Sequence, residues 1–107
     1  MNKFESELKN NNFVNSFCTG CNKHVWPPSD FCNSCFGNTM WKPVIRTAKL
    51  IEYSRKGDEV FGIVEFEDSI RVMGRIMTTD PKIGQLLTLL ECGYDNGKAK
   101  FVLTSAV

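Results

Sequence analysis

Four of the five cysteines fall into two C-x-x-C pairs, and this spacing constrains the fold more than any other feature. The pairs are Cys18/Cys21 and Cys32/Cys35, with ten residues between Cys21 and Cys32. Each pair places two sulfurs on one tight turn, and two such turns supply four thiolates at about 2.3 Å from a tetrahedral zinc ion. The pattern therefore predicts one structural zinc ion with no open position for substrate.

The sequence alone leaves two alternatives to zinc binding open for these cysteines, namely disulfide bonds and iron binding. Two disulfides would require an oxidising compartment, and residues 1–10 lack the apolar stretch of a signal peptide. We therefore expect a cytoplasmic protein with reduced thiols. Four thiolates also bind iron, as in electron carriers of the rubredoxin type. The fifth cysteine, Cys92, follows an apolar run and is expected to be a buried small side chain rather than a reactive thiol.

The charge balance argues against nucleic acid as the partner. Thirteen basic residues oppose twelve acidic ones, for a formal net charge of +1, and a loaded zinc site would shift this to about −1. Nucleic-acid binding depends on an excess of basic residues. The single histidine, His24, rules out a His-based catalytic triad within this chain, and we expect it to face solvent or to lie beside the metal without ligating it. We predict no catalytic residue. The sequence contains no stretch of 18 apolar residues, so we also predict no membrane-spanning helix.

Hydrophobic periodicity predicts a mainly β chain with one short helix. Residues 3–10 form the expected helix, with Phe4 and Leu8 on one face. A helix of this length does not fold alone, so these side chains must dock on the chain's own barrel or on a partner; we favour a partner.

Residues 13–17 are expected to be extended. Period-two alternation predicts five strands at 44–54, 60–66, 69–77, 86–94 and 99–104.

These elements define three predicted parts: an N-terminal helix at 1–12, a rubredoxin-like four-Cys zinc ribbon at 13–41, and a barrel at 42–107. Asn96-Gly97 is a strong hairpin signal, and Gly62 and Gly74 lie mid-strand where small barrels bend. Five strands with a long first one predict a five-stranded OB-fold barrel. The segment between the third and fourth strands is too short for the helix that many OB-folds carry there.

The order of these motifs resembles a known family. The matching segments are the two Cys pairs at 18–21 and 32–35, the Trp-Pro-Pro at 26–28, and the barrel segments at 62–67, 74–76 and 80–84. This arrangement resembles the small zinc-ribbon OB-fold proteins associated with acyl-CoA enzymes, formerly a domain of unknown function. The resemblance implies a non-catalytic scaffold or accessory subunit that partners a thiolase-like or hydroxymethylglutaryl-CoA synthase-like enzyme. It also allows contact between this chain and a CoA thioester.

Several residues have both a structural and a functional interpretation. Trp26, Phe31, Phe36 and Trp41 are expected to cover the metal and join ribbon to barrel, or to project into a partner. Arg71 and Arg75 either lie on a solvated strand face or anchor a phosphate. The carboxylates of Glu65, Glu67 and Asp68 surround a hairpin and are not expected to be catalytic. The alternative function is a single-stranded nucleic-acid-binding OB-fold, with Phe61, Arg71 and Arg75 on the binding face.

Overall fold

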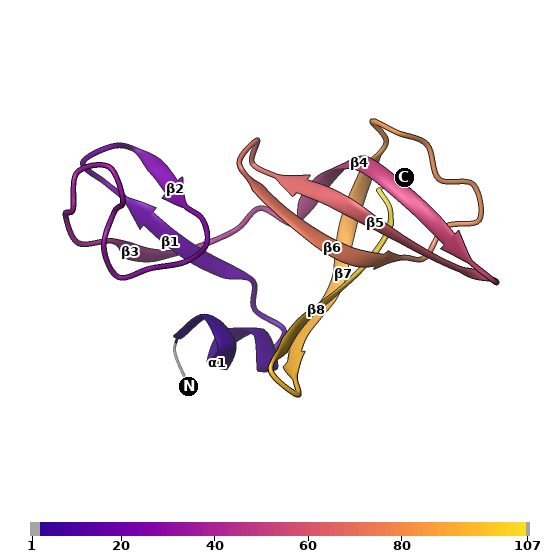
Figure 1. The fold of residues 1–107 in the computed structure, drawn as a ribbon, viewed down its shortest axis with the longest axis horizontal. Coiled ribbons are helices and arrows are strands. Elements are labelled where there is room, and N and C mark those ends of the chain that lie inside the picture. Colours follow the sequence, from indigo (N-terminus) through magenta and orange to yellow (C-terminus); the bar gives the residue numbers. More distant parts are fainter. Residues whose placement is uncertain (1–2, 107) are drawn as a thin grey trace.

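The computed structural model describes residues 3–106. Its single helix within that range, α1 (Lys3–Lys9), precedes a three-stranded ribbon sheet and then a barrel. In Figure 1 the ribbon sheet lies at the left and the barrel at the right, with α1 beside the lower end of the β7–β8 hairpin. The molecule is elongated, with extents of 44 × 28 × 21 Å. No helix in the described range is long and apolar enough to cross a membrane.

The ribbon sheet has the strand order β2-β1-β3 and is antiparallel throughout. Its strands are β1 (Val14–Cys18), β2 (Lys23–Val25) and β3 (Met40–Pro43). The extended segment predicted at 13–17 corresponds to β1, the central strand of this sheet. The flanking strands are short because the metal-binding turns begin directly after β1 and interrupt the chain between β2 and β3.

The barrel closes in the order β4-β5-β6-β8-β7, which is the strand order of an OB-fold. Its strands are β4 (Thr47–Lys56), β5 (Glu59–Phe66), β6 (Ile70–Ile76), β7 (Leu86–Asp95) and β8 (Lys98–Ser105). The mainly β fold predicted from the sequence, with a short N-terminal helix, a four-Cys cluster and a five-stranded barrel, is confirmed. The connection from β6 to β7 carries no helix.

The first barrel strand begins three residues later than the sequence pattern predicts. Val44 donates its N–H to the carbonyl of Phe13 at 3.0 Å, and Ile45 donates to the carboxylate of Glu67 at 3.1 Å. Val44 and Ile45 are apolar, and the predicted strand was therefore extended to include them. Their backbone N–H groups, however, pair with segments outside the barrel strands. Residues 44–46 therefore join the ribbon to the barrel instead of extending β4.

The N-terminal segment closes one end of the barrel. The ring of Phe13 is buried, with its centroid 5.0 Å from those of Phe66 and Phe101. Leu8 is fully buried in the same core, and Phe4 packs against it. The prediction that Phe4 and Leu8 dock on a partner is therefore wrong for Leu8, because the helix packs on the chain's own barrel. In place of the missing internal helix, α1 and Phe13 fill the barrel end.

Candidate metal centre

Two similar turns bring the cysteines together. In the first, Cys18 ends β1, and the backbone N–H of Cys21 donates to its sulfur at 3.4 Å. In the second, the N–H of Ser34 donates to the sulfur of Cys32 at 3.4 Å, and the N–H of Gly37 donates to Cys35 at 3.4 Å. Backbone N–H groups directed at sulfur stabilise thiolate charge. Both turns therefore suit cysteines that hold a cation.

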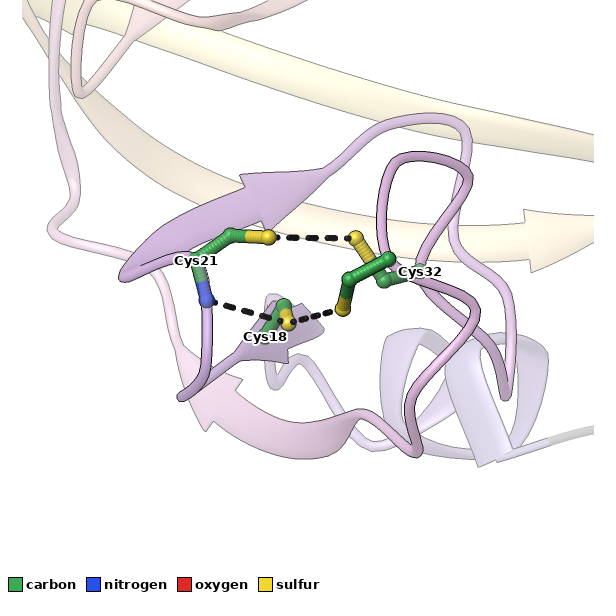
Figure 2. Close-up of side chains that lie close together, drawn as sticks. Cys18, Cys21 and Cys32 are labelled. Atoms are coloured by element: carbon green, nitrogen blue, oxygen red, sulfur yellow. Dashed lines mark hydrogen bonds between the residues drawn. The ribbon is translucent and has the colours of Figure 1, made fainter.

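The four sulfurs converge on one point. All four lie within 4.8 Å of one another, and Figure 2 shows Cys18, Cys21 and Cys32 directed into the space between the two turns. The sulfur–sulfur distance is 3.5 Å from Cys18 to Cys35 and 3.8 Å from Cys21 to Cys32. A tetrahedron with metal–sulfur bonds of about 2.3 Å has edges of about 3.8 Å, so the residues fit a tetrahedral metal ion.

The same distances argue against disulfides. A disulfide bond is about 2.05 Å long, and all five cysteines are free thiols. The close sulfurs belong to different C-x-x-C pairs, as expected for two turns that share one ion. The four cysteines named by the sequence are thus brought together, whereas Cys92 lies apart in β7.

Two of the four thiols, those of Cys21 and Cys32, have shifted pKa values. Backbone N–H groups of Cys35 and Ser34 lower the pKa of the Cys32 thiol to about 6. Hydrogen bonds with the thiols of Cys35, Cys32 and Cys18 raise the pKa of Cys21 to about 12. The pKa values of these two thiols are therefore shifted in opposite directions, that of Cys32 towards the thiolate and that of Cys21 towards the neutral thiol. A divalent cation is the group that would allow all four to ionise.

Each turn places a residue in the left-handed backbone region directly after its second cysteine. These residues are Asn22, with φ of 54°, and Phe36, with φ of 60°. Asn tolerates this conformation, but a phenylalanine rarely adopts it. Gly37, whose residue type would tolerate this conformation at no cost, follows Phe36 and does not have a positive φ. Gly37 instead allows close approach to the metal site, since a Cβ there would lie 3.3 Å from the Cys35 sulfur.

His24 does not face solvent, which was the first of the two positions expected from the sequence. Its side chain is 6% exposed, and its Nε2 lies 3.2 Å from the Glu67 carboxylate on the β5–β6 turn. Its Nδ1 lies 3.2 Å from the amide nitrogen of Asn15. His24 thus bridges the ribbon and the barrel. A single sequence gives no signal for this contact, because His24 and Glu67 belong to different parts of the chain.

The aromatic residues of the ribbon divide into two groups. Trp26 is partly buried against the barrel core, with its ring 5.9 Å from that of Phe4. Phe31 and Phe36 are 59% and 79% exposed. Trp26 therefore joins ribbon to barrel as expected, while Phe31 and Phe36 project outward from the metal-binding hairpin.

The two arginines on the outer barrel face are already paired. Arg71 donates to Glu65 at 2.6 Å, and Arg75 lies 3.7 Å from Glu59. Each pair joins neighbouring strands β6 and β5. A face whose cations are neutralised in this way gives little attraction for a phosphate backbone.

No protein-family model matches this sequence, and no curated protein matches it either. Solved structures do share its fold. The structure described as the Ltp2-ChsH2(DUF35) aldolase superposes with a TM-score of 0.75 and 18% identity, over 100% of this chain and 98% of that chain. A DUF35-family protein of unknown function from Sulfolobus solfataricus superposes with a TM-score of 0.70 and 15% identity, over 96% of this chain and 82% of that chain.

These structural neighbours are DUF35-family proteins, in agreement with the resemblance that the sequence motifs indicated. At these identities the comparison establishes the fold. The arrangement of an N-terminal helix, a three-stranded ribbon sheet and a five-stranded barrel is therefore a fold that this chain shares with them.

Proposed function

We propose that this chain is a non-catalytic, zinc-binding accessory subunit of a thiolase-like acyl-CoA enzyme complex. The observation that carries the proposal is the full-length structural match to a chain of the Ltp2-ChsH2(DUF35) aldolase, whose name pairs a DUF35 protein with a second component. Members of the family that the sequence motifs resemble act as partner subunits of thiolase-like enzymes. The same role is therefore proposed here, with a thiolase-like or hydroxymethylglutaryl-CoA synthase-like enzyme as the partner.

The metal site supports a structural role for the ion. Cys18, Cys21, Cys32 and Cys35 would fill all four positions of a tetrahedral ion, so no position is left for water or substrate. Zinc is proposed as the metal because four thiolates in a closed tetrahedral arrangement are typical of structural zinc sites. The ion would hold together a ribbon whose own buried apolar cluster is very small.

The exposed apolar residues support a role in assembly. Phe31, Phe36 and Met40 in the ribbon are all at least half exposed. Large apolar side chains that project from a small rigid unit are suited to bury themselves in a partner. The proposal therefore assigns the ribbon surface to contact with the enzyme.

Nucleic-acid binding is the weaker candidate. Its cationic residues on the barrel face, Arg71 and Arg75, already contact carboxylates. The chain has a formal net charge of +1 before any metal is bound. A steeply salt-dependent, submicromolar affinity for single-stranded RNA or DNA would reverse this ranking.

The test is to purify the tagged chain from its native host under moderate salt and to identify stoichiometric partners by mass spectrometry. The expected result is a thiolase-like or synthase-like enzyme, followed by reconstitution of the complex from the two purified proteins. Absence of any acyl-CoA enzyme in the complex contradicts the partner, and acyl-CoA turnover by the purified chain alone contradicts the non-catalytic role.

A further inference from the structure

The ribbon, residues 14–43, has a buried apolar cluster of its own. This cluster consists of Cys18, Val25 and Cys32, and it is separate from the barrel cluster. Within residues 3–106, no strand of the ribbon sheet pairs with a barrel strand. Trp26 packs against the barrel cluster from the ribbon side. The ribbon is therefore a small unit attached to the barrel rather than an extension of its sheet.

The chain crosses between ribbon and barrel at one point. Phe13, which leads into β1, and Val44, which follows β3, are both buried in the barrel cluster. Val44 donates its N–H to the carbonyl of Phe13 at 3.0 Å, and the first pair of the ribbon sheet, Val14↔Pro43, lies next to this bond. Two adjacent crossings form a single axis, and hinges consist of a few residues at the ends of elements. In Figure 1 the ribbon sheet extends away from the barrel beyond this axis.

Away from the crossings, side-chain contacts hold the ribbon in place. The Trp26 ring lies 5.9 Å from that of Phe4, and His24 Nε2 lies 3.2 Å from the Glu67 carboxylate. The same Glu67 oxygen accepts the N–H of Ile45 at 3.1 Å. One carboxylate on the β5–β6 turn thus holds both the ribbon and the segment directly after the crossing.

The turn that presents Glu67 has an unfavourable backbone conformation. Glu67 and Asp68 have φ of 48° and 58°. The β7–β8 hairpin also has two successive positive φ values, but there the residues are Asn96 and Gly97, which suit this conformation. Glutamate at such a position is disfavoured by its Cβ, and strain of this kind persists where the surrounding structure requires it. The position of Glu67 is therefore explained by its contacts across the junction and not by the needs of the turn.

The closed junction leaves two buried polar atoms without a hydrogen-bond partner. Within the described residues these are His24 Nε2, which lies close to Glu67 without an aligned bond, and Asn15 Oδ1. A buried polar group without a partner destabilises the state in which it is buried. Separation of the ribbon from the β5–β6 turn would let water reach the imidazole. The contact that holds the ribbon is therefore weak enough to be released.

Open space lies beside the ribbon at two places. One hollow, of about 370 Å³, lies between β3 and the β5–β6 turn, beside Lys42 and Ser69. The other, of about 300 Å³, lies between the end of α1 and the returning chain, beside Asn12 and Pro43. The two hollows share no lining residue. Rotation of the ribbon about the crossings is therefore not blocked by packed side chains at these places.

We propose that the ribbon is a hinged unit and that Glu67 is the latch that fixes its orientation on the barrel. The hinge is the pair of crossings at Phe13 and Val44. With the latch closed, ribbon and barrel tumble as one body; with the latch released, the metal-loaded ribbon turns as a rigid unit. Because Phe31 and Phe36 project from the ribbon, the latch also sets the direction in which these rings face. The inference concerns the chain alone and does not depend on the proposed function.

The measurement is the residual dipolar couplings of backbone amides in the isotope-labelled, metal-loaded chain. The couplings of the ribbon and those of the barrel, residues 47–105, are fitted separately. In the unmodified chain both sets are expected to fit one alignment tensor. In Glu67→Gly the ribbon couplings are expected to shrink and to depart from that tensor, because a swinging unit averages them.

The matched control is Asp68→Gly. Both positions have a positive φ that glycine adopts without strain, so both variants are expected to fold and to keep the barrel couplings. Only Glu67→Gly removes the carboxylate that contacts His24, and the ribbon of Asp68→Gly should therefore stay on the barrel's tensor. A second control, Glu65→Gln, removes a β5 carboxylate that pairs with Arg71 within the barrel, and it should leave the ribbon orientation unchanged.

Four results would contradict the proposal. A ribbon that keeps the barrel's tensor in Glu67→Gly would show that Glu67 is not the latch. The same loss of ribbon couplings in Asp68→Gly would show that the turn, and not the carboxylate, holds the ribbon. Two different tensors in the unmodified chain would mean that the ribbon is never latched. Loss of the metal ion from Glu67→Gly, measured by mass spectrometry, would mean that the ribbon does not move as a rigid unit.

Discussion

His24 in the ribbon and Glu67 in the barrel approach to 3.2 Å, between Nε2 and Oε2. The His24 Nε2 makes no well-directed hydrogen bond, so the two side chains are in close contact without an aligned bond. The same Glu67 oxygen accepts the Ile45 N–H at 3.1 Å, and Asn15, fully buried, contacts the other side of the imidazole. A line of polar groups therefore crosses the junction between ribbon and barrel.

The first prediction is that His24 and Glu67 are energetically coupled. In a double-mutant cycle with His24→Gln and Glu67→Gln, we expect a coupling free energy of about 0.5–3 kcal/mol, as found for residues in one polar network. Glu67→Gln retains an oxygen for the Ile45 N–H, so the cycle isolates the contact with the imidazole. The measurement is the free energy of unfolding in denaturant.

The exposed Lys100–Asp95 pair serves as the control for that cycle. Both of its side chains are 61% exposed, and pairs of this kind give about 0.2–1 kcal/mol. If the changes in unfolding free energy caused by His24→Gln and Glu67→Gln are additive in the double variant, the two residues do not link the ribbon to the barrel.

The second prediction concerns the metal. Cys32→Ser is expected to lose the bound ion and the ordered structure of the ribbon, because the site needs all four sulfurs and the ribbon has almost no core of its own. Cys92→Ser is the matched control and should keep one ion per chain. Metal content by mass spectrometry and amide NMR of residues 14–43 provide the readout.

The identity of the ion follows from the same samples. One zinc ion per chain is expected, and a strong chelator should unfold the ribbon while leaving the barrel signals in place. A coloured protein with thiolate-to-iron absorption would replace zinc by iron. A Cys32→Ser variant with full metal content would contradict the ligand assignment.

The parts of the fold that could be predicted are those set by local chemistry. The cysteine spacing alone indicates the metal cluster, and period-two alternation locates the barrel strands because each strand has one buried face, as in the β6 residues Ile70, Val72, Gly74 and Ile76. The strands β2 and β3 are short, three and four residues, and carry too few alternations to be recognised.

The missed features depend on contacts between distant residues. Nothing in the local sequence distinguishes Phe13, which closes the barrel, from Phe17, which lies under the ammonium of Lys42 at 4.3 Å. The left-handed conformation of Phe36 was missed because residue preferences favour Gly37 next to it. In both cases tertiary packing or metal-site geometry overrides the local preference.

The third prediction is that α1 is part of the folded core. Leu8→Ala is expected to cost about 2–5 kcal/mol of unfolding free energy, because Leu8 is fully buried beside Phe13. The exposed Lys9→Ala is the control on the same helix and should change stability by less than about 0.5 kcal/mol. A Leu8→Ala protein of unchanged stability, measured by denaturant unfolding, would show that the helix does not pack on the barrel.

The fourth prediction is a pH dependence due to Cys92. Burial raises the pKa of this thiol above its ordinary value of 9.0, against the opposing effect of Arg46. The neutral thiol is therefore favoured in the folded state. The stability that the neutral Cys92 thiol contributes is fully present below the pKa of this thiol in the unfolded chain. It is lost as the pH rises through the higher pKa of the folded chain. The stability advantage of the unmodified chain over Cys92→Ala should fall by less than about 1.4 kcal/mol per pH unit.

This difference is measured from unfolding curves of both proteins between about pH 7 and pH 10. Tyr94, whose pKa is raised by its hydrogen bond with Glu5, is present in both proteins and cancels in the comparison. An advantage that stays constant or grows with pH would mean that the Cys92 thiol ionises as readily in the folded chain as in the unfolded one.

The last prediction separates stability from assembly at Phe36. This residue combines a φ of 60° with an exposed fraction of 79%, so the ribbon gains little from the ring and bears a strained backbone. Phe36→Asn is expected to raise the stability of the metal-loaded ribbon by up to about 1 kcal/mol, because Asn tolerates the left-handed region.

If the ring of Phe36 instead serves to bury itself in a partner enzyme, the Phe36→Asn variant should bind that enzyme at least about tenfold more weakly, which corresponds to about 1.4 kcal/mol. Phe31→Ser supplies the comparison, since it removes an exposed ring at a position without a positive φ. A variant that is more stable and binds equally well would show that Phe36 has no role in docking. Greater stability with weaker binding would identify the strained phenylalanine as a contact residue of the assembled complex.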